Sequence, residues 1–334
     1  RVIGEKVTLD MVARACGCSK STVSRAISGK GRISEELKTR ILQYCEKSGY
    51  RTDVAKRFLQ TLRTKNLLVL LPPDQELSEI PFFFNCIMGI CEGAQKAGYS
   101  ILLMTGGSSE VQELRTILEQ KKADGVILLR VRVHDLVIEY LQDQELPFLV
   151  IGNSQKYSVQ YVDNDTERAC EALTIYLLQK NLSNMALIGG NREHIVTWKR
   201  LKGFQVGHAI CNKKVNQNQI YLDCNTKDVV YEVTENILRG SADCIVCMDD
   251  RICYQVLEKL HKMNVVVGRD IEVASFYDSR FLRGYSDSIT TLQFDEKSLG
   301  LMVCEKLISR IEKGIYESKM FTGYRIIPKN QAKR

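Results

Sequence analysis

The sequence predicts a small all-α head followed by a larger α/β core whose parallel sheets form two lobes. At 334 residues, the chain is long enough for two or three hydrophobic cores. The first 65 residues hold 15 Lys and Arg against 6 Asp and Glu, whereas the rest holds 32 against 34. Capping residues recur closely in this basic head, and short apolar runs alternate with amphipathic stretches after it. These observations divide the chain into two parts of different fold.

The basic head shows three short helices whose boundaries are marked by capping residues. Thr8 is expected to cap the first helix, and Gly17 is expected to end it. Ser19 caps a second helix over residues 20–28, and Ser34 caps a third. Two helices joined by a tight glycine-containing turn, with a third that closes a small core, follow the helix-turn-helix plan. A basic domain of this kind is expected to bind a polyanion, whereas a solvated basic tail would lack the helical pattern.

The second helix has two faces of different character when its residues are projected at about 100° per residue. Val23, Ala26 and Ile27 fall on one side and form the expected buried stripe. The opposite side combines short hydroxyls with Arg and Lys, which suits the major groove of DNA. An ordinary solvated face is the alternative, but the charge excess, the turn and the caps favour the groove. The residues of this polar face are Lys20, Ser21, Ser24 and Arg25.

Residues 7–25 read VTLDMVARACGCSKSTVSR, and Ile33-Ser34 and Gly49-Tyr50 follow. In this stretch the chain resembles the head of the lactose-repressor (LacI/GalR) family of transcription regulators, to which the Ser-x-x-Thr-Val-Ser-Arg pattern is highly specific. The resemblance implies a DNA-binding domain over residues 1–50 that binds a double-stranded DNA operator. The residues that it implies as base readers are Lys20, Ser21 and Arg25, and those near the DNA backbone are Thr8, Thr22, Ser24 and Arg32.

The segment 51–66, RTDVAKRFLQTLRTKN, lies between the head and the core. The resemblance implies a hinge helix that forms on DNA and inserts a leucine into the minor groove, where such a wedge unstacks a base step. Leu59 stands at the matching position, and Phe58 beside it is a second candidate for the wedge. Thr52 and Lys56 replace the family's usual Pro and small Ala, so a basic linker without this helix is the alternative.

From residue 67 onward, short apolar runs alternate with longer amphipathic stretches. This βαβ alternation predicts parallel sheets covered by helices on both faces. Two sets of runs, before and after about residue 162, predict two lobes, and a ligand is expected between them at the C-terminal ends of the strands. The strand-like runs lie at residues 67–71, 100–104, 125–129, 148–151, 185–188, 244–248, 271–274 and 289–292.

The family resemblance covers nearly the whole core, though less densely than the head. Its marks include Pro81-Phe82-Phe83, residues 123–127 (ADGVI) and residues 200–204 (RLKGF). It implies a periplasmic-binding-protein-like core over residues 67–334 that forms a homodimer, so that two heads bind one pseudo-palindromic site. The implied first lobe comprises about 67–162 and 292–321, and the second comprises about 163–291 and 322–330.

The resemblance also implies an effector site between the lobes. Phe82 and Phe83 are expected to stack on sugar faces or bases, and Asp250 to accept hydrogen bonds from ligand hydroxyls. Trp198 stands where the resemblance implies an effector-binding Arg, and Phe294 stands where it implies a Gln. Both replacements predict a more apolar cavity that favours a neutral, sugar-like ligand, and a degenerate site without an effector is the alternative. A bound ligand is expected to shift the lobes between two states and so change operator affinity.

Other function classes are disfavoured by motifs that the sequence lacks. It has no P-loop, no dinucleotide-binding glycine fingerprint and no His–carboxylate cluster of metal spacing, so neither an enzyme nor a cofactor is expected. A transport-type solute-binding protein would suit the core but not the basic head. No apolar run reaches the roughly 18 residues that span a bilayer, so no membrane partner is expected. The 12 scattered cysteines are typical of reduced thiols in the cytoplasm, with Cys244 and Cys247 on opposite faces of a buried strand.

Overall fold

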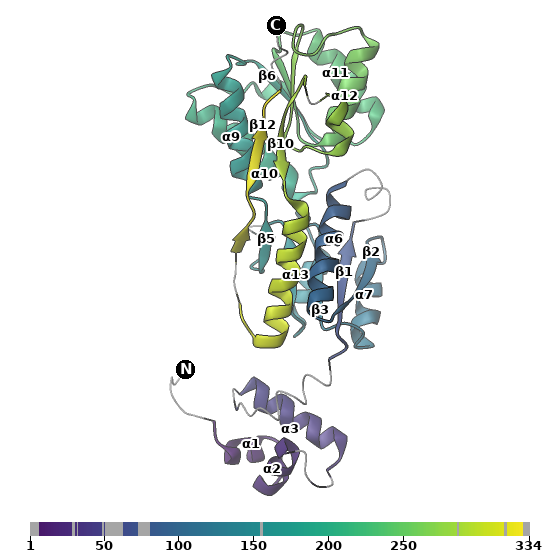
Figure 1. The fold of residues 1–334 in the computed structure, drawn as a ribbon, viewed down its shortest axis with the longest axis vertical. Coiled ribbons are helices and arrows are strands. Elements are labelled where there is room, and N and C mark those ends of the chain that lie inside the picture. The colour runs from purple at the N-terminus through teal and green to yellow at the C-terminus, as the bar shows by residue number, and fades with distance from the viewer. Residues whose placement is uncertain are drawn as a thin grey trace. The chain divides into compact units, whose positions relative to one another are not determined.

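The chain forms two compact units, Arg1–Thr64 and Lys65–Arg334. In Figure 1, the N-terminal unit consists of helices and the larger unit consists of two α/β lobes. The predicted fold class, an all-α head and a two-lobed core with parallel sheets, is therefore confirmed. The computed structural model describes residues 7–28, 31, 33–48, 50, 63–72, 81–153, 156–285, 287–316 and 319–329.

The N-terminal unit contains α1 (Leu9–Ala15), α2 (Lys20–Ser28) and α3 (Glu35–Lys47). Each helix begins at the predicted cap, where a side-chain hydroxyl accepts a hydrogen bond from an otherwise unsatisfied amide of the first turn. Gly17, at φ +64°, makes the turn between α1 and α2. The capping bonds join the amides of Met11, Thr22 and Leu37 to the hydroxyls of Thr8, Ser19 and Ser34 at 3.4, 3.1 and 3.3 Å, respectively.

A small apolar core holds these three helices together. The predicted stripe of α2 lies in it, and α3 contributes Ile41, Leu42 and Cys45. Arg40 of α3 donates a hydrogen bond to the carbonyl of Cys16 (2.8 Å), so a charged side chain satisfies the C-terminal end of α1. The buried residues of this core are Val12, Ala13, Cys16, Val23, Ala26, Ile27, Ile41, Leu42 and Cys45.

Each lobe of the larger unit is built on a six-stranded sheet. The first sheet contains β1 (Asn66–Leu71), β2 (Ser100–Thr105), β3 (Gly125–Leu128), β4 (Phe148–Ile151), β5 (Tyr161–Asp163) and β11 (Lys319–Phe321). The second contains β6 (Met185–Ile188), β7 (Ile220–Tyr221), β8 (Cys244–Cys247), β9 (Glu272–Ser275), β10 (Thr290–Phe294) and β12 (Tyr324–Ile327). The strand orders are β2-β1-β3-β4-β5-β11 and β7-β6-β8-β9-β10-β12, and every pairing is parallel except that of β10 with β12.

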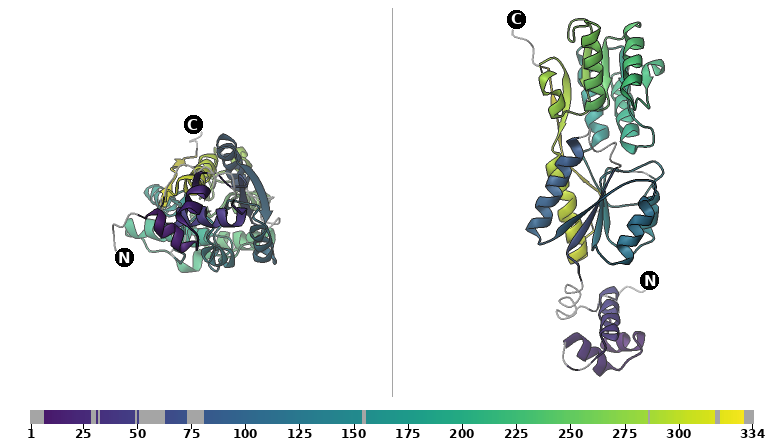
Figure 2. Two further views of the ribbon diagram at one scale, coloured as in Figure 1. Left: turned by 90° about the horizontal axis from the view of Figure 1, so that it is seen from below. Right: turned by 90° about the vertical axis from the view of Figure 1, so that its right-hand side faces the viewer.

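Helices cover both faces of each sheet (Figure 2). In the first lobe, α6 (Pro81–Lys96) and α13 (Glu296–Lys313) pack on one face, and α7 (Glu110–Glu119) and α8 (Leu136–Gln142) pack on the other. In the second lobe, α9 (Thr166–Gln179) and α10 (Ile195–Ile210) pack opposite α11 (Lys227–Leu238) and α12 (Asp250–Lys262). Short 3-10 helices span Gln217–Gln219 and Arg280–Tyr285.

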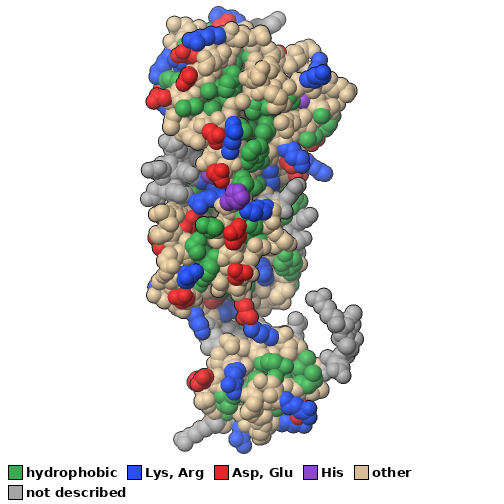
Figure 3. All heavy atoms as spheres, turned by 180° about the vertical axis from the view of Figure 1, so that it is seen from behind, with side chains coloured by type: hydrophobic (Ala, Val, Ile, Leu, Met, Phe, Trp, Pro, Cys, Tyr) green, Lys and Arg blue, Asp and Glu red, His purple; other side chains and the backbone are tan. Residues whose placement is uncertain are grey.

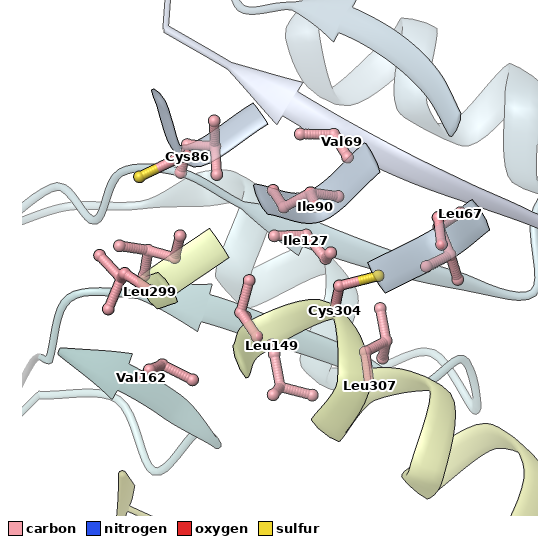
Figure 4. Close-up of a cluster of buried hydrophobic side chains, with 14 of the residues drawn as sticks. Leu67, Val69, Cys86, Ile90, Ile127, Leu149, Val162, Leu299, Cys304 and Leu307 are labelled. Carbon is pink, nitrogen blue, oxygen red and sulfur yellow. The ribbon is translucent and has the colours of Figure 1, made fainter. Parts of the chain in front are cut away.

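The close packing of α6 against α13 depends on glycine. A Cβ atom on Gly89 would lie 1.9 Å from the carbonyl oxygen of Lys297, and one on Gly300 would lie 2.0 Å from that of Cys86. The late helix α13 thereby completes the core of the first lobe. In Figure 4, Leu299, Cys304 and Leu307 of α13 lie beside Ile90 of α6 and the strand residues Leu67, Val69, Ile127, Leu149 and Val162.

The chain crosses between the lobes after β5, after β10 and after β11. β10 belongs to the second sheet as far as Phe294, so the second crossing follows residue 294, a few residues beyond the boundary expected near residue 291. The reason is the pairing of Thr291–Phe294 with Tyr324–Ile327, which extends the strand beyond its apolar run. β5 likewise keeps Asp163 in the first sheet, one residue beyond the expected boundary. These crossings form one side of the space between the lobes.

Candidate functional site

The outward face of α2 carries the polar residues that the sequence singles out. Because the buried stripe fixes the rotation of α2 on the head core, these side chains are held together on one side of the domain. Lys20 Nζ lies 3.1 Å from Asp10 Oδ1, and this ion pair links the start of α2 to α1. Thr22 is half-buried and the hydroxyls of Ser19 and Thr22 lie 2.8 Å apart. The exposed predicted residues are Thr8, Lys20, Ser21, Ser24 and Arg25.

Arg25 lies against the turn that follows α2. Gly31 in this turn has φ +102°, and a Cβ atom there would lie 3.2 Å from Cδ of Arg25. The glycine therefore permits both an unusual backbone conformation and close contact with the aliphatic part of the arginine. This contact restricts where the Arg25 side chain can lie on the outward face of α2.

Three residues predicted to contact DNA, Arg32, Phe58 and Leu59, lie outside the described residues. Most of the expected hinge segment 51–66 also lies outside them, since the description resumes at Arg63. The wedge therefore stays a prediction.

A cavity of about 640 Å³ lies between the two lobes of the core. Its wall is formed by residues at or just after the C-terminal ends of strands in both sheets, together with the first turn of α6 and of α10. Strand ends converge there because the strands of each sheet run parallel, as expected for doubly wound α/β domains. The lining includes Phe82, Phe83, Arg130, Asn153, Asn164, Asn191, His194, Arg200, Asp250, Tyr277 and Phe294.

Aromatic rings from both lobes meet on one side of this cavity. Phe82 of α6 contacts Phe83 edge-on at 5.4 Å between ring centroids and contacts Tyr277 of the second lobe at 6.2 Å. Tyr277 stacks on Phe294 at 6.3 Å and donates a hydrogen bond to Glu296 (2.7 Å). The structure thus brings the predicted Phe82, Phe83 and Phe294 together, and it adds Tyr277. Such a surface suits the apolar face of a sugar ring or another flat ligand.

Asp250 is a buried acidic group of the cavity wall, which Asp163 and Asp249 also line. It is fully buried at the start of α12, and no donor among the described residues lies in good hydrogen-bond geometry to either carboxylate oxygen. Burial, together with the charge of Asp249, raises the pKa of Asp250 to about 6, although Ser279 and the local backbone act in the opposite direction. Asp249 itself caps α12 through the amide of Ile252 (2.9 Å). Asp250 is therefore available to accept hydrogen bonds from a ligand.

Basic side chains form another part of the wall. Arg130, which follows β3, lies with its guanidinium carbon 5.2 Å from the Phe83 ring centroid and donates to His194 Nε2 (3.3 Å). Arg200 of α10 also lines the cavity, and its Nε is buried without an acceptor among the described residues. On the face drawn in Figure 3, a histidine lies near the middle of the core among side chains of both charges. The cavity is thus bounded by aromatic, acidic and basic groups.

The two lobes are joined beside the cavity by polar contacts. Lys199 of α10 forms a largely buried ion pair with Asp163 at the end of β5. The hydroxyl of Thr322 donates to Asn164 Oδ1 (2.7 Å), which links two of the three crossings. In the backbone, Val133 N donates to the carbonyl oxygen of Glu193 at 2.8 Å. These contacts define the geometry of the cavity wall.

Trp198 does not line the cavity, contrary to the sequence-based expectation. Its ring is 44% exposed, and Nε1 donates to the carbonyl oxygen of Arg192 at 2.7 Å. Arg200, two residues further along α10, lines the cavity instead, so the wall contains a guanidinium in addition to the predicted aromatic residues. The physical reason is helical geometry: Trp198 and Arg200 are two residues apart, about 200° around α10, so they face different directions.

Sequence reasoning missed Arg130, His194, Arg200 and Tyr277 as cavity residues. Helical spacing was a usable signal for Arg200, which is three residues after the buried Thr197 and four before the buried Phe204. Arg130 comes two residues after the fully buried strand β3, which is where a doubly wound fold places ligand contacts. Tyr277 stands at the equivalent place, two residues after β9, whereas His194 had no comparable local signal.

Among the described residues, no cluster of His, Cys, Asp or Glu is arranged to hold a metal ion. All twelve cysteines are free thiols. Cys244 and Cys247 pack in the hydrophobic clusters on opposite faces of the second sheet, as predicted, and burial raises both thiol pKa values well above normal. No helix in the described part of the chain is both long and apolar enough to cross a bilayer.

Both units match known families. Residues 8–53 match the bacterial regulatory proteins of the lacI family, and residues 64–323 match the periplasmic binding proteins and sugar binding domain of the LacI family. The regulator MalR of Streptococcus pneumoniae is 29% identical over 277 residues, which is 81% of this chain and 83% of MalR. The regulator RegA of Clostridium saccharobutylicum is 26% identical over 309 residues, 90% of this chain and 92% of RegA.

Solved structures show the same fold. The complex of the transcriptional regulator CelR with cellobiose matches 97% of this chain and 100% of its own, with 21% identity and a TM-score of 0.74. The lac repressor dimer bound to operator and an anti-inducer matches 98% of this chain and 100% of its own chain, with 16% identity and a TM-score of 0.71. The named relatives are transcriptional regulators rather than enzymes. The chain therefore belongs to the LacI family, as a DNA-binding transcriptional regulator with a helix-turn-helix head and a periplasmic-binding-protein-like sugar-binding domain.

Proposed function

We propose that the protein is a repressor that binds a pseudo-palindromic operator as a homodimer, and that a small sugar-like effector in the inter-lobe cavity changes its operator affinity. The observation that carries this proposal is the exposed basic face of α2, fixed on a helix-turn-helix core in the most basic part of the chain. The twelve free cysteines support action in the cytoplasm.

In the proposed complex, α2 enters the major groove. Arg25 and Lys20 donate hydrogen bonds to guanine, and Ser21 bonds to a base edge. Thr8, Thr22, Ser24 and Arg32 bind the phosphate backbone and set the position of the helix. Leu59, with Phe58 beside it, wedges into the minor groove at the operator centre.

A surface of the first lobe supports the homodimer. Phe84 and Met88 of α6 are 63% and 46% exposed, and Leu103 of β2 is 56% exposed. Large apolar side chains that cluster on neighbouring elements of a soluble protein are typical of an interface. Two copies related by a two-fold axis would present two heads to the two half-sites of an operator.

The cavity supports the effector role. Phe82 and Tyr277 offer ring faces to an apolar ligand surface, Phe83 and Phe294 complete this aromatic side, and Asp250 offers hydrogen-bond acceptors to hydroxyls. Because the wall is contributed by both lobes, a ligand that binds one lobe arrangement more tightly shifts the lobes toward it. That shift changes how the two heads of a dimer are spaced, and hence the operator affinity.

The decisive experiment is selection of preferred duplexes from a random library by the full-length protein. We expect a site with two inverted half-sites. Arg25→Ala is then expected to weaken binding to the selected site roughly ten- to hundredfold and to relax one base position per half-site. Binding is measured at several salt concentrations, because phosphate contacts make affinity salt-dependent.

Arg239→Ala is the matched control, since Arg239 ends α11 in the second lobe and its side chain is 74% exposed. It removes the same charge and should leave operator binding unchanged. Equal losses by Arg25→Ala on the selected site and on random DNA would contradict base reading. A single half-site in the selected duplexes would contradict the homodimer.

A further inference from the structure

Asp10 is the one acidic residue in the sequence 7–28, which contains α1 and α2. It lies in the first turn of α1, and its side chain reaches the start of α2. Asp10 Oδ1 lies 3.1 Å from Lys20 Nζ, and Asp10 Oδ2 lies 3.3 Å from Arg14 Nη2. Each carboxylate oxygen is thus paired with a different exposed cation. A carboxylate therefore stands beside the polar face of α2 that is proposed to enter the major groove.

The stability of the head does not explain this placement. The helix dipole favours an acid in the first turn of a helix, but Glu35 has that position in α3 and pairs only within its own helix, with Lys38. Exposed ion pairs contribute little to folding. On a surface that binds DNA, a carboxylate also repels the phosphates, so Asp10 is expected to weaken binding to DNA of any sequence. An interaction that forms only at a specific site would offset this effect.

The chemistry of Lys20 supplies such an interaction. A lysine ammonium group has three hydrogen-bond donors at the end of a flexible four-carbon chain, so a lysine without restraint is a poor reader of one base. The pairing with Asp10 occupies one donor of Lys20 and restricts the position of Nζ. Two donors remain for the O6 and N7 acceptors of a guanine. Arg14 pairs with the other oxygen of Asp10 and so restricts the carboxylate in turn.

We propose that Asp10 is a positioning residue for base recognition, which holds Lys20 toward a guanine and so makes one base position of each half-site selective. This inference rests on the proposed role of α2 in the major groove and adds a residue to it. Asp10 acts through Lys20 and contacts no base itself. It increases selectivity while it lowers the affinity for DNA in general, because its charge is repelled by the phosphates.

The test compares binding of the full-length protein to its selected duplex, to a random duplex, and to duplexes with each single base-pair change made in both half-sites. Lys20→Met identifies the position that Lys20 reads. Asp10→Asn is expected to reduce the preference for guanine at that position roughly threefold or more, and to tighten binding to the random duplex about two- to fivefold. The double variant Asp10→Asn/Lys20→Met should lose no more selectivity than Lys20→Met alone, because Asp10 acts through Lys20.

Glu35→Gln is the matched control. Glu35 also lies in the first turn of a head helix and also pairs with a lysine, Lys38 at 3.6 Å, but this partner belongs to the same helix. The variant removes the same charge and should leave the selectivity at every position unchanged. A merely structural role of Asp10 would instead weaken binding to all duplexes alike when Asp10 is replaced.

The proposal fails if Lys20→Met relaxes no position, or if Asp10→Asn leaves the Lys20 position as selective as in wild type. It also fails if Glu35→Gln relaxes that position to the same extent, since the effect would then be one of charge alone. Arg25→Ala in the same assay shows separately whether α2 reads bases, so the proposed function can survive the failure of this inference.

Discussion

At the scale of single residues, Asp250 shows how a buried carboxylate lowers stability. Its ordinary pKa of 3.8 is raised to about 6 by burial and by the charge of Asp249. The folded chain therefore holds the proton of Asp250 more tightly than the unfolded chain does. The fold is therefore more stable in acid, where the carboxyl group is protonated in the folded and in the unfolded chain, than at neutral pH. At neutral pH the buried carboxylate must ionise.

Asp250→Asn is accordingly expected to stabilise the core at pH 7.5 by about 2–3 kcal/mol, because an amide has no charge to bury. The gain should shrink as the pH falls through 6 and nearly disappear by about pH 3, where the carboxyl group is protonated in both states. Denaturant unfolding at several pH values measures this profile. Asp228→Asn, at the exposed start of α11, is the control and should show no such dependence. A pH-independent gain would contradict the assignment.

At the scale of elements, both lobes use the same device to bring two helices together. Gly300 of α13 faces the backbone of α6, and Gly203 of α10 faces the backbone of α9, where a Cβ would lie 2.4 Å from the carbonyl oxygen of Glu167. In each lobe, the paired helices pack on the same side of the sheet. Glycine therefore sets the distance between helices that form the walls of the hydrophobic core.

Gly300→Ala tests this packing. The added methyl group would lie 2.0 Å from a backbone oxygen, so α6 and α13 must separate and the core of the first lobe must loosen. We expect a loss of roughly 2–3 kcal/mol, larger than the small gain in helix propensity. Thermal unfolding of the core measures it. Gly107→Ala, where a Cβ would meet nothing within 4 Å, should be neutral, and equal effects of both variants would refute the packing argument.

At the scale of the whole molecule, the arrangement of elements was predictable from the sequence. The caps at Thr8, Ser19 and Ser34 act within one helical turn, and so they are visible in the sequence itself. The apolar runs of the core likewise report strands buried on both faces, such as β3 and β8. Interactions within a single helical turn or a single strand are therefore sufficient to predict the fold class.

The composition of the cavity was not predictable to the same degree. Its wall combines residues of α6, of the segment that follows β3 and of α10, which only the folded topology brings together. Aligned position favoured Trp198, but the side chain of that residue faces away and Arg200 faces the cavity. A shift of two residues along a helix reverses the direction of a side chain, so small errors of register change the expected chemistry.

Besides the three chain crossings, few contacts hold the two lobes against each other. The ion pair of Asp163 with Lys199 joins the end of the first sheet to a helix of the second lobe, and the side chains are only 6% and 16% exposed. Asp163 also accepts bonds from the amide of Asn164 and the hydroxyl of Thr166. Removal of Lys199 alone would leave a buried carboxylate without its counter-charge, which is costly.

Lys199→Met is therefore expected to destabilise the core by about 3 kcal/mol, and the double variant Asp163→Asn/Lys199→Met should recover more than half of this loss. Lys202→Met is the matched control, because Lys202 lies on the same helix and pairs at 2.8 Å with Glu167, but its side chain is 54% exposed. Such an exposed pair should contribute less than about 0.5 kcal/mol. Denaturant unfolding of the two single variants, the double variant and wild type gives the coupling between Asp163 and Lys199 directly. If their effects are additive, this ion pair does not hold the lobes together, and the crossings and the other contacts between the lobes do so, among them the backbone bond of Val133 to Glu193 and the contact of Phe82 with Tyr277.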